Sequence, residues 1–259
     1  MRVDSLLSER GVFDSRARAA ASVLAGDVLM GPHRQRATKP GQLVPEDIEL
    51  QVTAAPPYVS RGGLKLAHAL DTLGLDVRGR HALDVGASTG GFTDCLLQRG
   101  ADHVIALDVG YGELHWRLRT DPRVTPIERH NARGLNPRDL DYTPDVVVID
   151  VSFISLSKVL APVLACAAAT FDCLALVKPQ FEVGRGQVGK GGVVREAALR
   201  RQALLDVGIE AAQIGVAVMG YASSGLPGPK GNLETFIWLA EPARGGLENL
   251  AAAALRVEP

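Results

Sequence analysis

Apolar and polar positions divide the 259-residue chain into two regions with different patterns. In the longer region, from about residue 60 onward, continuous apolar runs alternate with stretches of helical periodicity. A run such as Val146-Val147-Val148-Ile149 is typical of a parallel strand whose two faces are both covered. Five strands of this kind are predicted, at His81–Val85, His103–Asp108, Val124–Glu128, Asp145–Asp150 and Cys173–Val177.

Helical stretches separate most of these strands, and a further helix leads into the first one. The predicted helices are Ser60–Leu73, Gly91–Arg99, Tyr111–Arg119, Lys158–Thr170 and Arg195–Val207, with a short one in the tail Gly245–Pro259. Two last strands, Ile214–Met219 and Leu233–Leu239, have little but a loop rich in Gly and Pro between them. The pattern predicts an α/β fold, a doubly wound sheet that ends in an antiparallel strand pair. Such sheets bind ligands outside the carboxyl ends of their strands.

The first 53 residues predict a separate, small α+β domain. Its predicted elements are helices at Arg2–Arg10 and Arg16–Ala25 and strands at Val28–Met30 and Ile48–Val52. Either Asp14 or Ser15 is expected to cap the second helix. Because the adjacent prolines of Pro56-Pro57 disfavour helix, residues 54–60 are interpreted as a stiff linker and residues 61–259 as the second domain.

Composition and charge exclude several classes of protein. Apolar residues make up 46% of the chain and charged residues 22%, a composition typical of globular proteins. The net charge of −1 gives no overall attraction to nucleic acid. The three cysteines form no C-x-x-C pair and the six histidines are scattered, so neither a disulfide nor a metal site is predicted. No apolar signal segment follows the N-terminus, and Asp172 interrupts the most apolar window, Val159–Val177. We therefore expect a cytoplasmic protein that does not enter a membrane.

Basic residues concentrate near the N-terminus, where residues 1–40 hold seven Lys or Arg against four Asp or Glu. A solvated charged face would account for this excess as well as a binding surface does. The spaced positions Arg2-Val3-Asp4-x-x-Leu7, Gly11, Ser15-Arg16-x-x-Ala19, Gly26-x-Val28 and Lys39-Pro40 resemble the small RNA-binding module of the ribosomal-protein-S-four type. The resemblance implies an RNA-facing side to which Arg2, Arg16, Arg18 and Lys39 belong, with contacts mainly to phosphates.

A glycine-rich turn follows the first strand of the longer region, in Asp84-Val85-Gly86-Ala87-Ser88-Thr89-Gly90-Gly91-Phe92. Glycines let the backbone turn tightly and approach a ligand, and the N-terminus of the next helix attracts an anionic group. The spacing Gly-x-x-x-Gly-Gly matches neither the dinucleotide-binding pattern nor a phosphate loop, and a plain tight turn would also explain the glycines. Asp108 ends the next strand, where an acid can accept hydrogen bonds from ribose hydroxyls. Asn131 follows the third strand and is placed to contact an adenine edge.

Together, these positions resemble the S-adenosylmethionine pocket of class I methyltransferases. The resemblance implies S-adenosylmethionine as cofactor, bound by Asp84, Gly86, Ser88, Gly90, Gly91, Phe92, Asp108 and Asn131. The segment after the fourth strand, Asp150-Val151-Ser152-Phe153, has neither the Asn/Asp-Pro-Pro-aromatic run of amino-methylating DNA enzymes nor the Pro-Cys of cytosine-carbon enzymes. Another acceptor group is therefore indicated.

Four charged side chains are predicted to meet at the carboxyl edge of the sheet. Asp150 and Lys178 end the fourth and fifth strands, Glu234 begins the last strand, and Lys65 lies on the leading helix. A free alcohol loses its proton only above about pH 15, so this charged set suggests a ribose hydroxyl whose proton the protein must remove. A lysine, with an ordinary pKa of about 10.4, does this only where desolvation or a second positive charge favours the neutral amine. We interpret Lys178 as the base, although each residue alone is also explained as a surface or rim charge.

The order Lys65, Asp150, Lys178, Glu234 resembles the tetrad of ribose 2′-O-methyltransferases of the FtsJ/RrmJ group. Longer runs, Ser-Phe-Ile-Ser-Leu at 152–156 and Val-Lys-Pro-Gln-Phe-Glu-Val-Gly at 177–184, are close to the TlyA family, and this match spans almost the whole chain. That family joins the RNA-binding module to the catalytic domain and methylates cytidine 2′-hydroxyls in bacterial ribosomal RNA. The resemblance therefore implies ribosomal RNA, within assembled subunits, as the partner, and we expect a monomer.

The linker Pro56-Pro57-Tyr58-Val59 lacks the arginine of the family's Arg-Ala-Trp-Val, which leaves coupling of the two domains open.

Arg61, Arg133 and Phe153 are further candidates for RNA contact. A target nucleotide inside folded RNA must leave its stack, and an aromatic ring at the end of the fourth strand is placed to receive the base. Phe153 is equally explained as a core residue. Two alternatives to the enzyme stay open here: an RNA-binding or ribosome assembly factor without activity, and a membrane-lysing protein, because members of the family are often labelled haemolysins.

Overall fold

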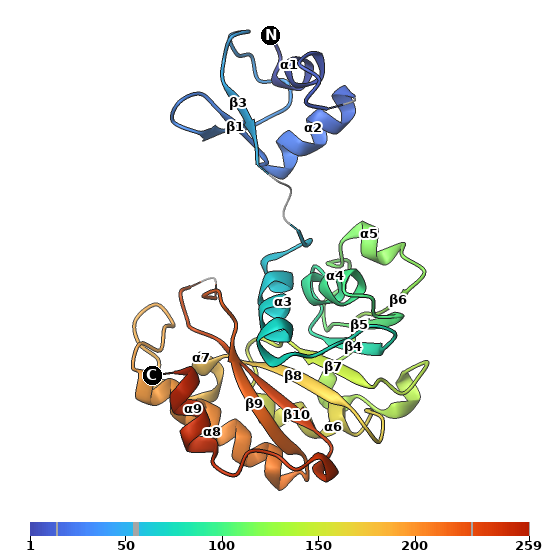
Figure 1. Ribbon diagram of the computed structural model, residues 1–259, viewed down its shortest axis with the longest axis vertical. Coiled ribbons are helices and arrows are strands. Elements are labelled where there is room, and N and C mark those ends of the chain that lie inside the picture. Colours follow the sequence, from blue (N-terminus) through green and yellow to red (C-terminus); the bar gives the residue numbers. More distant parts are fainter. Residues whose placement is uncertain (14, 54–56, 229, 259) are drawn as a thin grey trace. The chain divides into compact units, whose positions relative to one another are not determined.

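Figure 1 shows the computed structural model, which describes residues 1–13, 15–53, 57–228 and 230–258. The chain divides into two compact units, Met1–Pro57 and Tyr58–Pro259. Of the expected linker, residues 54–56 lie outside the described residues. Tyr58 and Val59 pack against a hydrophobic core of the second unit, so this end of the linker belongs to that unit.

The smaller unit consists of two helices and a three-stranded antiparallel sheet. Its elements are α1 (Val3–Glu9), α2 (Arg16–Ala25), β1 (Val28–Met30), β2 (Gln35–Arg36) and β3 (Leu50–Val52), with strand order β2-β1-β3. Ser15 caps α2, because its side chain accepts a hydrogen bond from the Arg18 N–H at 3.3 Å. Asp14, the other candidate cap, lies outside the described residues. The sequence pattern does not predict β2, because both of its residues are exposed.

A seven-stranded sheet forms the centre of the larger unit. Its strands are β4 (His81–Val85), β5 (His103–Leu107), β6 (Val124–Ile127), β7 (Val146–Ile149), β8 (Asp172–Val177), β9 (Ala217–Ser223) and β10 (Thr235–Ala240). The strand order is β6-β5-β4-β7-β8-β10-β9. The first five strands of this order are parallel, and β10 pairs antiparallel with both β8 and β9. The predicted doubly wound sheet with an antiparallel end is confirmed.

Helices cover both faces of this sheet (Figure 1). They are α3 (Arg61–Leu73), α4 (Gly91–Gln98), α5 (Trp116–Arg119), α6 (Leu160–Leu164), α7 (Pro179–Glu182), α8 (Ala197–Gln213) and α9 (Leu250–Val257), with 3-10 turns at Ala132–Gly134, Pro137–Asp139, Leu156–Lys158, Arg185–Gln187 and Pro242–Arg244. Leu66 of α3 and Leu96 of α4 share one core with Val148, whereas Leu204 of α8 shares the other core with Val147. Neighbouring valines therefore face opposite cores, which explains the continuous apolar run in β7.

Two helical stretches are shorter than the pattern predicts. In place of a helix over 111–119, α5 is a single turn, because Gly112 has a left-handed φ of +74° and the His115 ring begins the helix by accepting the Arg117 N–H. The expected helix over 158–170 is reduced to α6 and turns, and the N–H of Ala168 bonds to Pro144 O outside any helix.

The end of α8 and the start of β9 also differ from the pattern. The helix continues past Val207 to Gln213, and a Cβ at Gly208 would lie 2.7 Å from the Tyr221 hydroxyl, so glycine there permits close packing. Gly215, with φ +82°, follows the helix end, and β9 begins at Ala217 instead of at Ile214. Glycine in a helix interior usually weakens it, which is why the pattern predicts an earlier end.

Candidate active site

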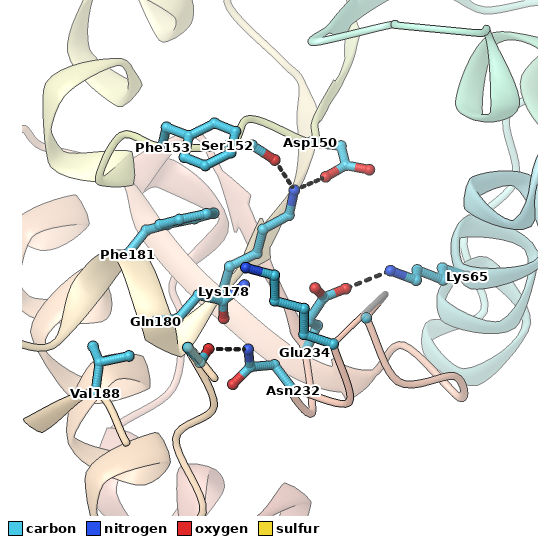
Figure 2. Close-up of a pocket in the computed structure, with 13 residues that line it drawn as sticks. Lys65, Asp150, Ser152, Phe153, Lys178, Gln180, Phe181, Val188, Asn232 and Glu234 are labelled. Carbon is cyan, nitrogen blue, oxygen red and sulfur yellow. Dashed lines mark hydrogen bonds and ion pairs between the residues drawn. The ribbon is translucent and has the colours of Figure 1, made fainter. Parts of the chain in front are cut away.

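Strand register brings the four predicted charged residues to one edge of the sheet. In the pairing of β10 with β8, Thr235 lies opposite Val177, so Glu234 just before β10 neighbours Lys178 just after β8. Asp150 follows β7, which pairs with β8 on its other side. Lys65 lies on α3, and all four side chains line one cavity of about 480 Å³ (Figure 2).

The four side chains form two ion pairs. The Lys178 Nζ lies 2.6 Å from Asp150 Oδ1 and donates a hydrogen bond to Ser152 Oγ at 2.8 Å. The Lys65 Nζ pairs with Glu234 Oε2. Both lysines and Glu234 are buried, at 7%, 9% and 3% exposure for Lys65, Lys178 and Glu234. Buried charges are tolerated when they are paired, so each lysine depends on its carboxylate.

A second cavity of about 470 Å³ lies at the glycine-rich turn and shares a wall with the first. Gly86, Ser88, Asp108 and Asn131 line it, together with Asp150, Ser152 and Phe153, which also line the first cavity. Gly86 has φ +85°, and a Cβ there would lie 2.5 Å from Asp150 O, so only glycine lets the turn approach the end of β7. The two cavities therefore meet at the segment 150–153.

Asp108 and Asn131 hold the loops around this second cavity. The Asp108 carboxylate accepts hydrogen bonds from the N–H groups of Ser88 and Gly110, both at 2.7 Å. A carboxylate has about four acceptor positions, so Asp108 keeps capacity for ligand hydroxyls. The Asn131 side-chain oxygen accepts the Arg133 N–H at 3.0 Å, so contact with a base would fall to its amide nitrogen.

Asp84 and Gly90 lie behind the turn instead of on a cavity wall. Asp84 is fully buried, its Oδ2 accepts the N–H and hydroxyl of Thr93, and its Oδ1 has no partner among the described residues. A Cβ at Gly90 would overlap Leu118 and Leu114, so glycine there serves packing. These two residues support the turn from inside.

Gly91, Phe92 and Arg61 line a third cavity of about 400 Å³, together with Gly86, Ser88, Lys65 and Asp150. The Phe92 ring packs on Phe236 with 5.7 Å between ring centroids. Arg61 donates a hydrogen bond to Pro227 O at 2.7 Å, which ties the start of α3 to the loop before β10. Asp150 lines all three cavities.

The remaining RNA candidates differ in their surroundings. Phe153 is 92% exposed, so the core interpretation of this residue is wrong, and Arg133 is exposed on the 3-10 turn that follows Asn131. In the smaller unit Arg2 and Arg16 both form ion pairs with Oδ2 of buried Asp4, at 2.8 and 3.1 Å. The Arg2 guanidinium holds the pKa of Asp4 far below its usual range. Arg18 and Lys39 are exposed in the same unit.

Several residues at the site are not singled out by the sequence pattern. Ser152 contacts Lys178, and Phe181 lies 5.4 Å from Phe153 between ring centroids. Gln180 and Lys230 also line the first cavity. Ser152 and Gln180 are each two residues beyond a charged strand end, which is the signal that points to them; nothing in the pattern points to Lys230.

A family model for FtsJ-like methyltransferases matches residues 58–241. The chain belongs to this family. Family membership implies S-adenosylmethionine as methyl donor, and the second cavity fits it: Gly86 opens the backbone to a ligand and Asp108 supplies free acceptor positions. Placement of each cofactor contact stays a prediction.

The curated relatives cover both units of the chain. It is 49% identical over 240 residues to the 16S/23S rRNA (cytidine-2′-O)-methyltransferase TlyA of Mycobacterium tuberculosis, covering 92% of this chain and 89% of that protein. It is 39% identical over 236 residues to Hemolysin A of Brachyspira hyodysenteriae, covering 90% and 97%. A solved Streptococcus thermophilus chain that carries a hemolysin name matches with a TM-score of 0.76 and 38% identity, over 99% of this chain and 95% of that one. These matches place the chain among the TlyA proteins.

The described residues form neither a membrane-spanning helix nor a metal-ligand cluster. Within these residues, every helix is too short or too polar to cross a membrane. In the same part of the chain, no group of three or more His, Cys, Asp or Glu side chains is arranged to hold a metal ion.

We expect Asp84 to make protein stability depend on pH. Burial, opposed by the Thr93 hydrogen bonds, raises the pKa of Asp84 to about 7. Because an unfolded aspartate has a pKa of about 3.9, the folded state holds the proton more tightly, and the free energy of unfolding should fall by about 3 kcal/mol between pH 4 and pH 7. Denaturant unfolding over this range measures the effect, and Asp84→Asn should lack it. Parallel curves for the two proteins would contradict the assignment.

Proposed function

We propose that this protein transfers a methyl group from S-adenosylmethionine to the 2′-hydroxyl of cytidines in ribosomal RNA. The observation that carries the proposal is the shared wall of two cavities: the glycine-rich turn borders one, the two lysine–carboxylate pairs line the other, and Asp150 borders both. The printed activity of the 49%-identical Mycobacterium tuberculosis relative supports the acceptor.

Lys178 is the proposed base. When bound, S-adenosylmethionine supplies a methyl group on a positively charged sulfur, and a positive charge beside an amine favours its neutral form. Asp150 and Ser152 hold the Lys178 Nζ in place, so the amine would accept the hydroxyl proton as the hydroxyl oxygen takes the methyl group. The bond between that methyl group and the sulfur would break, and the sulfur would leave as a neutral thioether. The paired Lys65 and Glu234 line the same cavity and are proposed to orient the ribose.

The acceptor cavity carries one positive charge that the protein does not neutralise. Lys65 and Lys178 are paired with carboxylates, whereas Lys230 has no ion pair or hydrogen bond to any residue in the described part of the chain. Each nucleotide of RNA brings one phosphate charge. We infer that Lys230 contacts a phosphate next to the target ribose, and that the rings of Phe153 and Phe181 receive the base.

The smaller unit is proposed to bind RNA through Arg2, Arg16, Arg18 and Lys39. Asp4 supports this role, because it orients two guanidinium groups on one exposed face.

Arg61 and Arg133 are proposed as further RNA contacts in the larger unit. Assembled ribosomal subunits in the cytoplasm are the proposed substrate, and since one chain supplies all four charged side chains, a monomer suffices.

Replacing Lys178 should abolish methyl transfer while donor binding is kept. Lys178→Ala removes the base, and Lys178→Arg keeps a positive charge but cannot lose its proton, so both should lower the transfer rate by roughly 100-fold or more. The measurement is transfer of labelled methyl to ribosomal subunits, with donor affinity measured separately by calorimetry. Full activity in Lys178→Ala would refute the assignment.

Lys230→Ala should weaken RNA binding without disturbing the chemistry. Loss of one phosphate contact should raise KM for RNA more than it lowers kcat, and should reduce the salt dependence of log affinity by about 0.7 to 0.9. Lys190→Ala is the matched control, because Lys190 is an exposed lysine that does not line the cavity. An equal change in both variants would show that only overall charge matters.

A further inference from the structure

The backbone of Phe153 is held in a conformation that large side chains rarely adopt. Its φ is +64°, in the left-handed region, and the residue is 92% exposed. Such a conformation is strained for a residue with a side chain and persists only where its surroundings fix it. Since Phe153 lines both the donor and the acceptor cavity, what fixes it matters for function.

The loop 151–156, which carries Phe153, is held at both ends by one short segment that follows β8. At the first end, Ser152 Oγ accepts a hydrogen bond from Lys178 Nζ at 2.8 Å. In the middle, the Phe153 ring lies beside the Phe181 ring (Figure 2). At the far end, the two carboxylate oxygens of Glu182 accept hydrogen bonds from the Ser155 hydroxyl at 2.6 Å and from the Leu156 N–H at 3.0 Å.

Burying a carboxylate such as that of Glu182 is energetically unfavourable, so a hydrogen bond that only supports the fold does not require one. Burial, together with the negative charges of Glu210 and Asp206 on α8, raises the pKa of Glu182. No ion pair to Glu182 is found among the described residues, so its negative charge is balanced by hydrogen bonds alone. Its two oxygens are instead used to hold two consecutive residues of the loop. This use of both oxygens indicates a role in positioning the loop.

We propose that Glu182 is a positioning residue for methyl transfer, which holds the loop 151–156 so that Phe153 and Ser152 keep their places between the two cavities. The inference rests on the proposed function. Glu182 lines none of the three cavities at the site, so it acts through the loop and not on the substrate. Its loss should therefore slow transfer while leaving donor affinity unchanged.

Three variants test this role. Glu182→Leu removes both acceptors, whereas Glu182→Gln restores the bonds, because its amide oxygen accepts the Leu156 N–H and its amide nitrogen donates to the Ser155 hydroxyl. Glu210→Gln is the control, since it removes a nearby, partly buried carboxylate that accepts no hydrogen bond from the loop. Each variant is assayed for kcat, KM for ribosomal subunits, donor affinity and hydrogen exchange of the Leu156 amide.

We expect kcat of Glu182→Leu to fall at least about tenfold, with donor affinity within about twofold and faster exchange at Leu156. Glu182→Gln and Glu210→Gln should stay within about threefold of the parent. The inference is overturned if Glu182→Leu keeps full kcat, or if donor affinity and overall thermal stability fall in parallel with kcat. If the parent protein itself transfers no methyl, the proposed function fails, and unchanged Leu156 exchange in Glu182→Leu then overturns the positioning role separately.

Discussion

The antiparallel pairing of β10 with β8 is the constraint on which the site depends. It sets Thr235 opposite Val177 and so brings Glu234 to the edge where Lys178 and Asp150 already lie. Buried lysines are tolerated only beside partner charges, and each lysine here has one. A parallel last strand would deliver Glu234 to the opposite edge and leave Lys65 buried without a partner, at a cost of roughly 3–5 kcal/mol.

A second constraint is the close approach of the glycine-rich turn to the end of β7. Gly86 leaves no room for a Cβ beside Asp150 O, so the cavity at the glycine-rich turn and the cavity lined by the two lysine–carboxylate pairs share the segment 150–153 as a wall. The same segment carries the strained Phe153 and the hydrogen-bonded Ser152. The strand ends thus hold Asp150 and Lys178, and Ser152 and Phe153 of the loop after β7 line both cavities.

The sequence predicts those parts of the site that topology alone places. Residues at the ends of parallel strands share an edge in any doubly wound sheet, which is why the sequence alone points to Asp150, Lys178 and Asp108. The pattern cannot predict contacts made through loops: Lys230 and Glu182 follow no strand-end rule. It also cannot separate glycines that face a ligand from those that permit close packing, and a Cβ at Gly90 would overlap Leu114 and Leu118. The pattern ends α8 too early because glycine disfavours helix, and it does not show that Gly208 is needed for close packing against Tyr221.

The most direct test of the whole account is the chemical identity of the methylated nucleoside. Ribosomal RNA from subunits treated with the purified protein and an isotopically labelled methyl donor is digested to nucleosides and analysed by mass spectrometry. The proposed base, Lys178, is held between Asp150 and Ser152 and would take its proton from a hydroxyl, so 2′-O-methylcytidine is the expected labelled product. Label on the cytosine ring, on carbon or on the amino nitrogen, would contradict it.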